Sequence, residues 1–111
     1  MPRFLAIYTM RPENVARFRA LAREEQDAID AKGIARWKRW EADHAAMLGD
    51  RAMVGRTRRA TAEGVEDAVN TICGYVVVEA ADLDAAATIF AGHPHMTVFP
   101  GDAVDVMPFV T

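Results

Sequence analysis

The sequence has few of the residues that build covalent or metal-linked scaffolds. Its 111 residues include one cysteine and three histidines. One cysteine excludes an internal disulfide, so the chain is compatible with a reducing compartment. Three histidines without a Cys-x-x-Cys or His-Glu-x-x-His spacing argue against a structural metal site. We therefore expect no metal and no other cofactor.

An excess of one charge and a long apolar run are also missing. The chain carries 13 basic and 16 acidic residues, a net charge of -3, which argues against nucleic-acid binding because that affinity rests on neutralising phosphates. No stretch approaches the ~18 apolar residues of a membrane span, and the first twenty residues lack the apolar core of a signal peptide. We expect a soluble, cytoplasmic protein that binds neither nucleic acid nor membrane.

The clearest structural signals lie in the stretch Cys73 to Phe109. The valine-rich run from Tyr75 to Ala80 predicts a strand. Asp82 stands where a helix N-cap is needed, and Gly92 can end that helix in the left-handed conformation. Pro94 then prevents its continuation.

The two ends of the chain predict two further strands. Residues 103–109 alternate in polarity, and Pro108 places this strand at a sheet edge or ends it there. Phe4 to Thr9 is apolar on both faces, which is typical of a central strand.

The middle of the chain predicts one long helical crossover. Apolar residues recur at helical spacing from Val15 to Ile29 and again from Ile34 to Leu48. We expect a break or kink at Gly33 and a stop at Gly49-Asp50.

A weaker strand from Ala52 to Ala60 and a loop from Thr61 to Thr71 complete the pattern. The order strand, helix, strand, strand, helix, strand predicts a single α+β domain over residues 1–111. The expected fold is the ferredoxin-like β-α-β-β-α-β sandwich, a four-stranded antiparallel sheet with both helices on one face. One helix layer can cover only one of two apolar sheet faces, so we expect a homodimer that buries the other.

The three histidines are the first candidates for chemistry. His93 and His95 flank Pro94 in an expected loop, where they could act as an acid-base pair, ligate a metal, or satisfy the carbonyls of the preceding helix. His44 follows Trp40 and Trp37 on the apolar helix stripe, either as a hydrogen-bonded packing residue or as a neutral base facing a pocket.

Four other residues complete the candidate site. Asp102 could orient an imidazole or serve a turn. Tyr8 could line a pocket between sheet and helices, as a substrate contact. Arg56 and Arg58 share a strand face and could capture a substrate carboxylate or phosphate, although solvated charges on an edge strand are the preferred account.

The segment from Gly74 to Pro108, reading GYVVVEAADLDAAATIFAGHPHM and then GDAVDVMP, resembles the second half of YCII-related (DGPF-type) domains. The DGPF tetrapeptide itself is absent, and His93 stands where smaller members often have an acid before the proline. The resemblance implies a ferredoxin-like protomer that forms a dimeric α/β barrel, and a role in small-molecule chemistry.

Two functions follow as hypotheses. The first is a small-molecule enzyme or enzyme-like binding protein with a pocket lined by Tyr8, His44, His93 and His95. The alternative is a non-catalytic dimeric sensing or protein-interaction module that acts through its surface.

Overall fold

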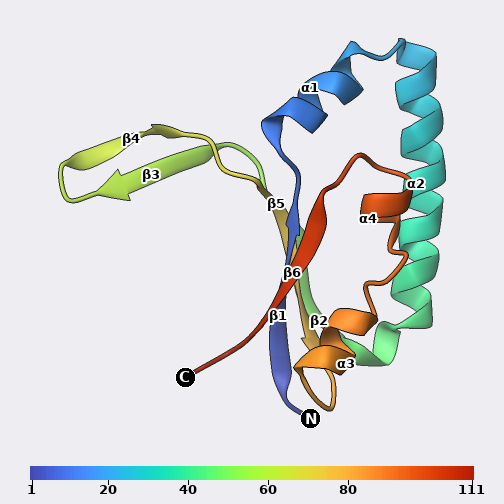
Figure 1. Ribbon diagram of the computed structural model, residues 1–111, viewed down its shortest axis with the longest axis vertical. Coiled ribbons are helices and arrows are strands. Elements are labelled where there is room, and N and C mark those ends of the chain that lie inside the picture. Colours follow the sequence, from blue (N-terminus) through green and yellow to red (C-terminus); the bar gives the residue numbers. More distant parts are fainter.

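The computed structural model describes residues 1–111 and has a four-stranded antiparallel sheet at its centre. The strands are β1 (Arg3–Thr9), β2 (Leu48–Met53), β5 (Ile72–Glu79) and β6 (Ala103–Pro108), in the order β2-β5-β1-β6. Helices α2 (Arg23–Asp43), α3 (Leu83–Thr88) and α4 (Pro94–Thr97) lie against one face, and α1 (Pro12–Ala20) lies beyond one end of the sheet (Figure 1). This arrangement is the expected ferredoxin-like α+β fold.

The core lies between that helix layer and the sheet. Phe4, Ala6 and Tyr8 of β1 are buried, whereas the alternate residues Leu5 and Ile7 are half-buried on the other face. Pairing of Phe4 with Val78 and of Ala6 with Val76 places the buried valines of β5 on the helix side as well. The apolar character of both faces is confirmed, and helices cover only one of them (Figure 1).

The expected break at Gly33 is wrong. Helix α2 runs through Gly33 without interruption, and the crossover instead bends at Leu21 and Ala22, whose backbones are extended. Gly33 instead allows a close contact between α2 and Phe99. A Cβ at this position would collide with the Phe99 ring.

The expected end of the crossover is also too late. Helix α2 stops at Asp43, a short 3₁₀ turn η1 (Ala45–Met47) follows, and Gly49 and Asp50 already belong to β2. None of the helices contains an apolar stretch long enough to cross a bilayer.

The strand expected over residues 52–60 and the loop over 61–71 are wrong as well. The chain forms the end of β2 there, and then a separate hairpin of β3 (Thr57–Thr61) and β4 (Gly64–Ala68). Gly64 has a φ of 139°, which other residues rarely adopt, and this conformation permits the tight turn between the two strands.

The second half of the chain forms largely as expected. Asp82 caps α3 by accepting the Ala85 N–H at 2.7 Å, as expected. Gly92 has the left-handed φ of 73°, but α3 already ends at Thr88, so Gly92 is not its cap. Strand β6 lies at a sheet edge, as Pro108 indicated. The loop expected at His93-Pro94-His95 is wrong, because this segment begins the short helix α4.

Candidate functional site

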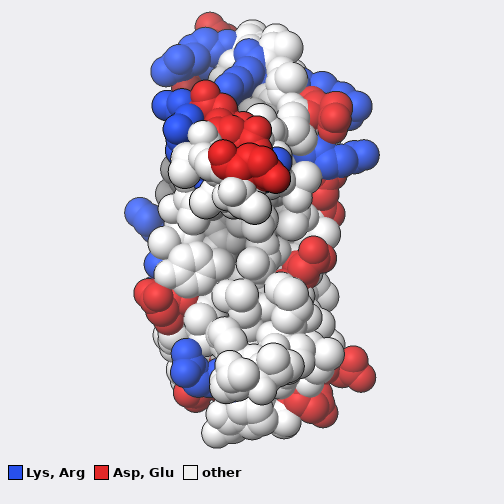
Figure 2. All heavy atoms as spheres, turned by 90° about the vertical axis from the view of Figure 1, so that its left-hand side faces the viewer, with Lys and Arg blue, Asp and Glu red and all other residues white.

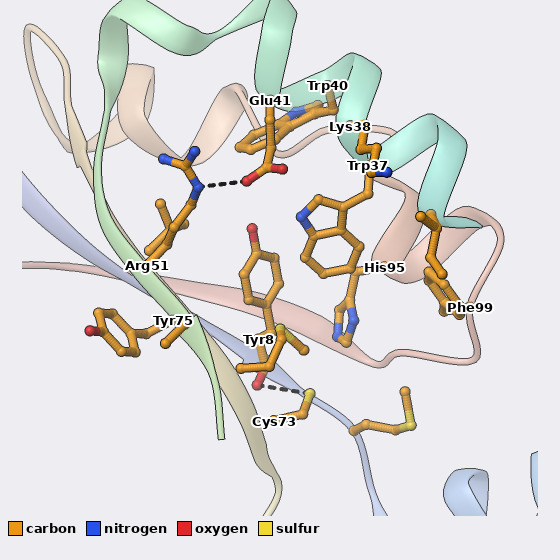
Figure 3. Close-up of a pocket in the computed structure, with 15 residues that line it drawn as sticks. Tyr8, Trp37, Lys38, Trp40, Glu41, Arg51, Cys73, Tyr75, His95 and Phe99 are labelled. Atoms are coloured by element: carbon orange, nitrogen blue, oxygen red, sulfur yellow. Dashed lines mark hydrogen bonds and ion pairs between the residues drawn. The ribbon is translucent and has the colours of Figure 1, made fainter. Parts of the chain in front are cut away.

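A cavity of about 470 Å³ opens between α2, the β2-β5-β1 part of the sheet and the segment after α4 (Figure 3). Eleven of its fifteen lining residues are hydrophobic, and this mixture of an apolar wall with a few polar groups is typical of small-molecule sites. The lining residues are Tyr8, Met10, Ile34, Trp37, Lys38, Trp40, Glu41, Arg51, Ala52, Met53, Cys73, Tyr75, Val76, His95 and Phe99.

Tyr8 enters this cavity because of its register in β1. It shares a face with Phe4 and Ala6, so its ring lies over the sheet toward Trp37, with ring centroids 4.9 Å apart. Burial raises the pKa of its hydroxyl above the usual value, and the charge of Glu41 adds to the effect. Tyr8 is therefore a neutral phenol at every physiological pH.

His93 lies behind Tyr8 and has no exposed surface. Its Nδ1 accepts the backbone N–H of His95 at 2.9 Å, which makes it the N-cap of α4. Because Nδ1 accepts, the proton of the neutral ring lies on Nε2, which stands 3.4 Å from the Tyr8 hydroxyl. Burial above all, with the neighbouring His95, lowers the pKa of His93 to about 3, so the ring is neutral.

This tautomer decides what Tyr8 can do. Nε2 of His93 is a donor, so the Tyr8 oxygen accepts from it and keeps its own O–H free. Figure 3 shows that hydroxyl directed toward the space between Glu41, Arg51 and Trp37. Tyr8 thus offers a hydrogen-bond donor to a molecule in the cavity.

His95 offers the complementary group. Its Nε2 donates to the Thr9 carbonyl at 2.8 Å, which leaves Nδ1 as the unprotonated nitrogen. Nδ1 makes no hydrogen bond within the protein, and no fully buried polar side-chain atom is without a partner, so water can reach this nitrogen. Burial is the main cause that lowers the pKa of His95, which keeps the ring neutral, so Nδ1 can accept a hydrogen bond.

The backbone at Gly101 packs directly against the His95 ring. A Cβ at Gly101 would collide with Nε2 and the carbonyl oxygen of His95, so a glycine is needed there. The Gly101 N–H donates to that same carbonyl at 2.9 Å. The His95 ring is therefore fixed between Gly101, Thr9 and the cavity.

Charged side chains stand at the margin of the cavity, and sequence reasoning missed them. Arg51 of β2 and Glu41 of α2 form an ion pair of 2.6 Å, and both are partly exposed. Lys38, one helical turn before Glu41, forms no ion pair in the structure. The only available signal was the helical spacing of Lys38 and Glu41 beside the two tryptophans.

The structure brings together only part of the expected site. Tyr8 and His95 line the cavity, and His93 contacts Tyr8 from behind without lining it. Of the two roles expected for His44, the structure shows the hydrogen-bonded packing residue and not the pocket base. It is the C-cap of α2, its Nδ1 lies 2.8 Å from the Trp40 carbonyl, and its ring packs against Trp40.

The expected roles of three other residues are not supported by their positions. Arg56 and Arg58 lie on the hairpin outside the cavity, and both bind Asp67, at 2.6 and 3.0 Å. Asp102 bonds to the backbone N–H and side chain of Arg11 and to Asn14, not to an imidazole. These bonds from Arg11 hold the pKa of Asp102 below its usual value. Asp102 therefore ties the start of β6 to the start of α1.

No three histidine, cysteine, aspartate or glutamate side chains are grouped as metal ligands would be. Cys73 donates through its thiol to the Tyr8 carbonyl at 3.3 Å, and burial raises its pKa. The polar chemistry of the cavity therefore rests on Tyr8, His95 and the charges at its margin.

No protein-family model matches the chain, and no curated protein matches it. Among solved structures, it is similar to 5-chloro-2-hydroxyhydroquinone dehydrochlorinase (TftG) from Burkholderia phenoliruptrix AC1100, in complex with 2,5-dihydroxybenzoquinone. The match covers 96% of this chain and 92% of that one, with a TM-score of 0.58 and 15% sequence identity. A likeness at this identity establishes the shared fold.

Proposed function

We propose that this protein is a small-molecule enzyme or enzyme-like binding protein of the YCII-related type, with its site in the cavity beside Tyr8 and His95. The observation that carries the proposal is a fixed donor and a free acceptor within one largely apolar cavity. Tyr8 supplies the O–H, and His95 supplies the unprotonated Nδ1. Their ring centroids are 5.2 Å apart, so one small molecule can contact both.

The cavity favours a small ring that carries oxygen substituents. Trp37 and Trp40 provide flat apolar surfaces for such a ring. A ligand hydroxyl would donate to Nδ1 of His95, and a ligand carbonyl oxygen would accept from Tyr8. When His95 takes the proton from the ligand hydroxyl, the electron pair of the broken O–H bond stays on the ligand, and Tyr8 stabilises the oxygen that gains the negative charge.

Two further facts support this proposal. TftG, which shares the fold, was solved with a ring compound of this kind, 2,5-dihydroxybenzoquinone. The resemblance of Gly74 to Pro108 to YCII-related domains points in the same direction. The second candidate, a sensing or interaction module, is favoured by the open sheet face and requires no ligand in the cavity.

Calorimetric titration of the protein with 2,5-dihydroxybenzoquinone tests the proposal. We expect saturable binding, weakened at least tenfold in Tyr8→Phe and in His95→Gln. The glutamine can keep the donor to the Thr9 carbonyl while it removes the free ring nitrogen. Tyr75→Phe is the matched control, because the Tyr75 hydroxyl bonds to Asp50 at 2.7 Å.

Equal affinity in the wild-type protein and in folded Tyr8→Phe and His95→Gln variants would contradict the roles assigned to these residues. No binding of this compound or of a panel of simple phenols and quinones would favour the interaction module.

We also propose that the protein forms a homodimer, as expected from the sequence, through the open sheet face. A compact monomer of 12.2 kDa exposes roughly 6,100 Å², whereas this chain exposes 7353 Å². The excess of roughly 1,200 to 1,300 Å² exceeds the ~800 Å² that each partner buries in an interface of standard size. Below the hairpin, the open face carries few charged groups (Figure 2).

The open face includes Leu5, Ile7, Val77 and Met107, which share one side of the sheet by their register. Sedimentation equilibrium at micromolar concentration should give twice the chain mass of 12.2 kDa. Leu5→Lys should shift that equilibrium to the monomer, because burial of an unpaired charge opposes association. A folded wild-type monomer at this concentration would contradict the dimer.

A further inference from the structure

The hairpin β3–β4 forms a two-stranded sheet of its own, separate from the four-stranded sheet. All residues from Arg58 to Asp67 are exposed. The side-chain hydrogen bonds and ion pairs within this ribbon, including those from Arg56 and Asn70, stay within the hairpin and its two connections. Figure 1 shows the ribbon projecting from the end of the sheet, away from α2, α3 and α4.

A free ribbon of this kind has little to hold it together. Arg56 and Arg58 both pair with Asp67, and Arg59 stands opposite Glu66 across the strands. Exposed ion pairs contribute little, however, and a lone two-stranded hairpin is marginally stable in water. A hairpin of only five residue pairs would therefore be stabilised by packing against another protein surface.

The direction of the hairpin indicates which surface that is. It projects on the side of the open sheet face, opposite the helices (Figure 1). Two sheets that pack face to face lie ~10 Å apart, whereas strands of five residues extend roughly 17 Å. An arm of this length on this side would pass the plane of a second sheet that covered the open face.

One side of the ribbon carries two exposed valines beside an ion-paired aspartate. Val65 of β4 and Val69, just after it, are 63% and 73% exposed. Alternation along the strand puts them on one face, where Ala60 stands opposite Val65. Asp67 lies between the two valines on that face, opposite Arg58, and its charge is paired with Arg56 and Arg58. In water these valines gain nothing from their position, and against a protein surface they would be buried.

We propose that the β3–β4 hairpin is a dimerisation arm that lies against a second copy of this chain, with its Val65 and Val69 side in contact with the partner. This inference rests on the homodimer proposed above. The second copy is the occupant that fits, because the excess surface of the chain is larger than each partner buries in a standard dimer interface, and the arm borders the face that the dimer would bury.

Hydrogen exchange at two protein concentrations tests the arm directly. When the protein is concentrated enough to be dimeric, the amides of β3 and β4 should exchange at least tenfold more slowly than in dilute monomer. The β1 and β5 amides at the centre of the sheet should change less, because they are already bonded within the chain. Equal exchange of the arm amides in monomer and dimer would overturn the proposal.

Variants measure the contribution of the arm to association. Val65→Thr with Val69→Thr keeps β-branched residues in the ribbon and should raise the dimer dissociation constant at least fivefold. Leu83→Ser removes a 41% exposed apolar side chain on the helix side and should leave the constant unchanged.

A deletion provides the larger perturbation. Val54 and Cys73 are already hydrogen-bonded at 3.0 Å, so an Asn-Gly turn can join them in place of residues 55–72. Circular dichroism checks that the shortened chain folds, and its dissociation constant should rise at least tenfold.

An unchanged constant in both the folded deletion and the double threonine variant would overturn the arm. A wild-type monomer even at 100 times the dilute concentration would overturn both the arm and the dimer. Neither result alters the titration of the cavity, which can be measured on monomer or dimer.

Discussion

The corner around His93 and the β3–β4 hairpin stand at opposite extremes of packing within one small chain. His93 and His95 are 0% and 2% exposed, and each ring nitrogen that is shielded from water has its own partner. The hairpin is exposed from Arg58 to Asp67, and the ion pairs that it forms are between its own residues and Arg56. Side chains are thus packed tightly beside the proposed ligand site. The hairpin, where we propose contact with a second copy, packs little against the rest of the chain.

The largest expected effect comes from filling the corner. Gly101→Ala should destabilise the protein by about 3 kcal/mol, because the new methyl group collides with His95 and disturbs its bond to Thr9. Gly55→Ala, beside the hairpin, is the matched control, since nothing lies within 4 Å of its Cβ position. Urea unfolding measures both, and equal stability of the two variants would remove the contrast between corner and hairpin.

The second effect is a pH dependence confined to the corner. The folded pKa of His93 is lowered to about 3 from 6.5, so between these values the unfolded chain binds a proton that the folded chain does not. Stability should therefore be complete above pH 6.5 and should fall as the pH drops, by roughly 1 kcal/mol per unit. Urea unfolding at pH 7, 6 and 5 measures this slope.

His93→Asn sharpens that test. Asparagine is a good N-cap and can still accept the His95 N–H, but it does not titrate. The slope should become shallower while the lowered pKa of His95 still contributes. A variant with the wild-type slope would show that the acid sensitivity arises elsewhere.

The third effect concerns the contact between α2 and Phe99. Alanine normally stabilises a helix by ~1 kcal/mol relative to glycine, but Gly33→Ala should destabilise this one by about 1 kcal/mol, because its methyl group meets the Phe99 ring. Thermal unfolding decides the sign. The double variant Gly33→Ala with Phe99→Leu should recover part of the loss, and a failure to recover would mean that the ring is not the cause.

The smallest effect is expected in the hairpin. Asp67→Asn removes the partner of both Arg56 and Arg58, yet all three groups are exposed and such pairs contribute little to global stability. The thermal midpoint should stay within ~1 °C of the wild-type value. Hydrogen exchange of β3 and β4 in dilute protein should nevertheless become faster. A large drop in the midpoint would mean that the hairpin is coupled to the core.

The sequence predicts those features that depend on neighbours along the chain. Alternation in Phe4 to Thr9, the valine-rich run before Ala80 and the cap at Asp82 each carry their own signal, and together they are sufficient for the fold. Gly33 wrongly predicted a helix break. A glycine is needed there because the Phe99 side chain, distant in sequence, contacts α2 in the folded state. The hairpin was missed because its short strands are mostly exposed and rich in charged residues, so they lack the apolar run that marks a core strand.

The site was predictable only in part for the same reason. Tyr8 and His95 could be selected as polar groups among apolar residues. The Glu41–Arg51 pair joins a helix to a strand and depends on how the two elements pack. His44 lies at the helical spacing of the pocket residues. Because α2 ends at Asp43, His44 is the C-cap of the helix, and its ring lies beside the Trp40 carbonyl.

The irregular pairing at the end of β1 has a consequence for how this chain can change over time. Between Tyr8 and Thr9 the register to β5 shifts, and the Thr9 carbonyl accepts from the Asp102 N–H and from His95. One residue gained or lost before that point would turn Tyr8 to the opposite face and remove its hydroxyl from the cavity. A point substitution in β1 changes one side chain and keeps the register of the others. An insertion or deletion there would remove the Tyr8 hydroxyl from the cavity in one step.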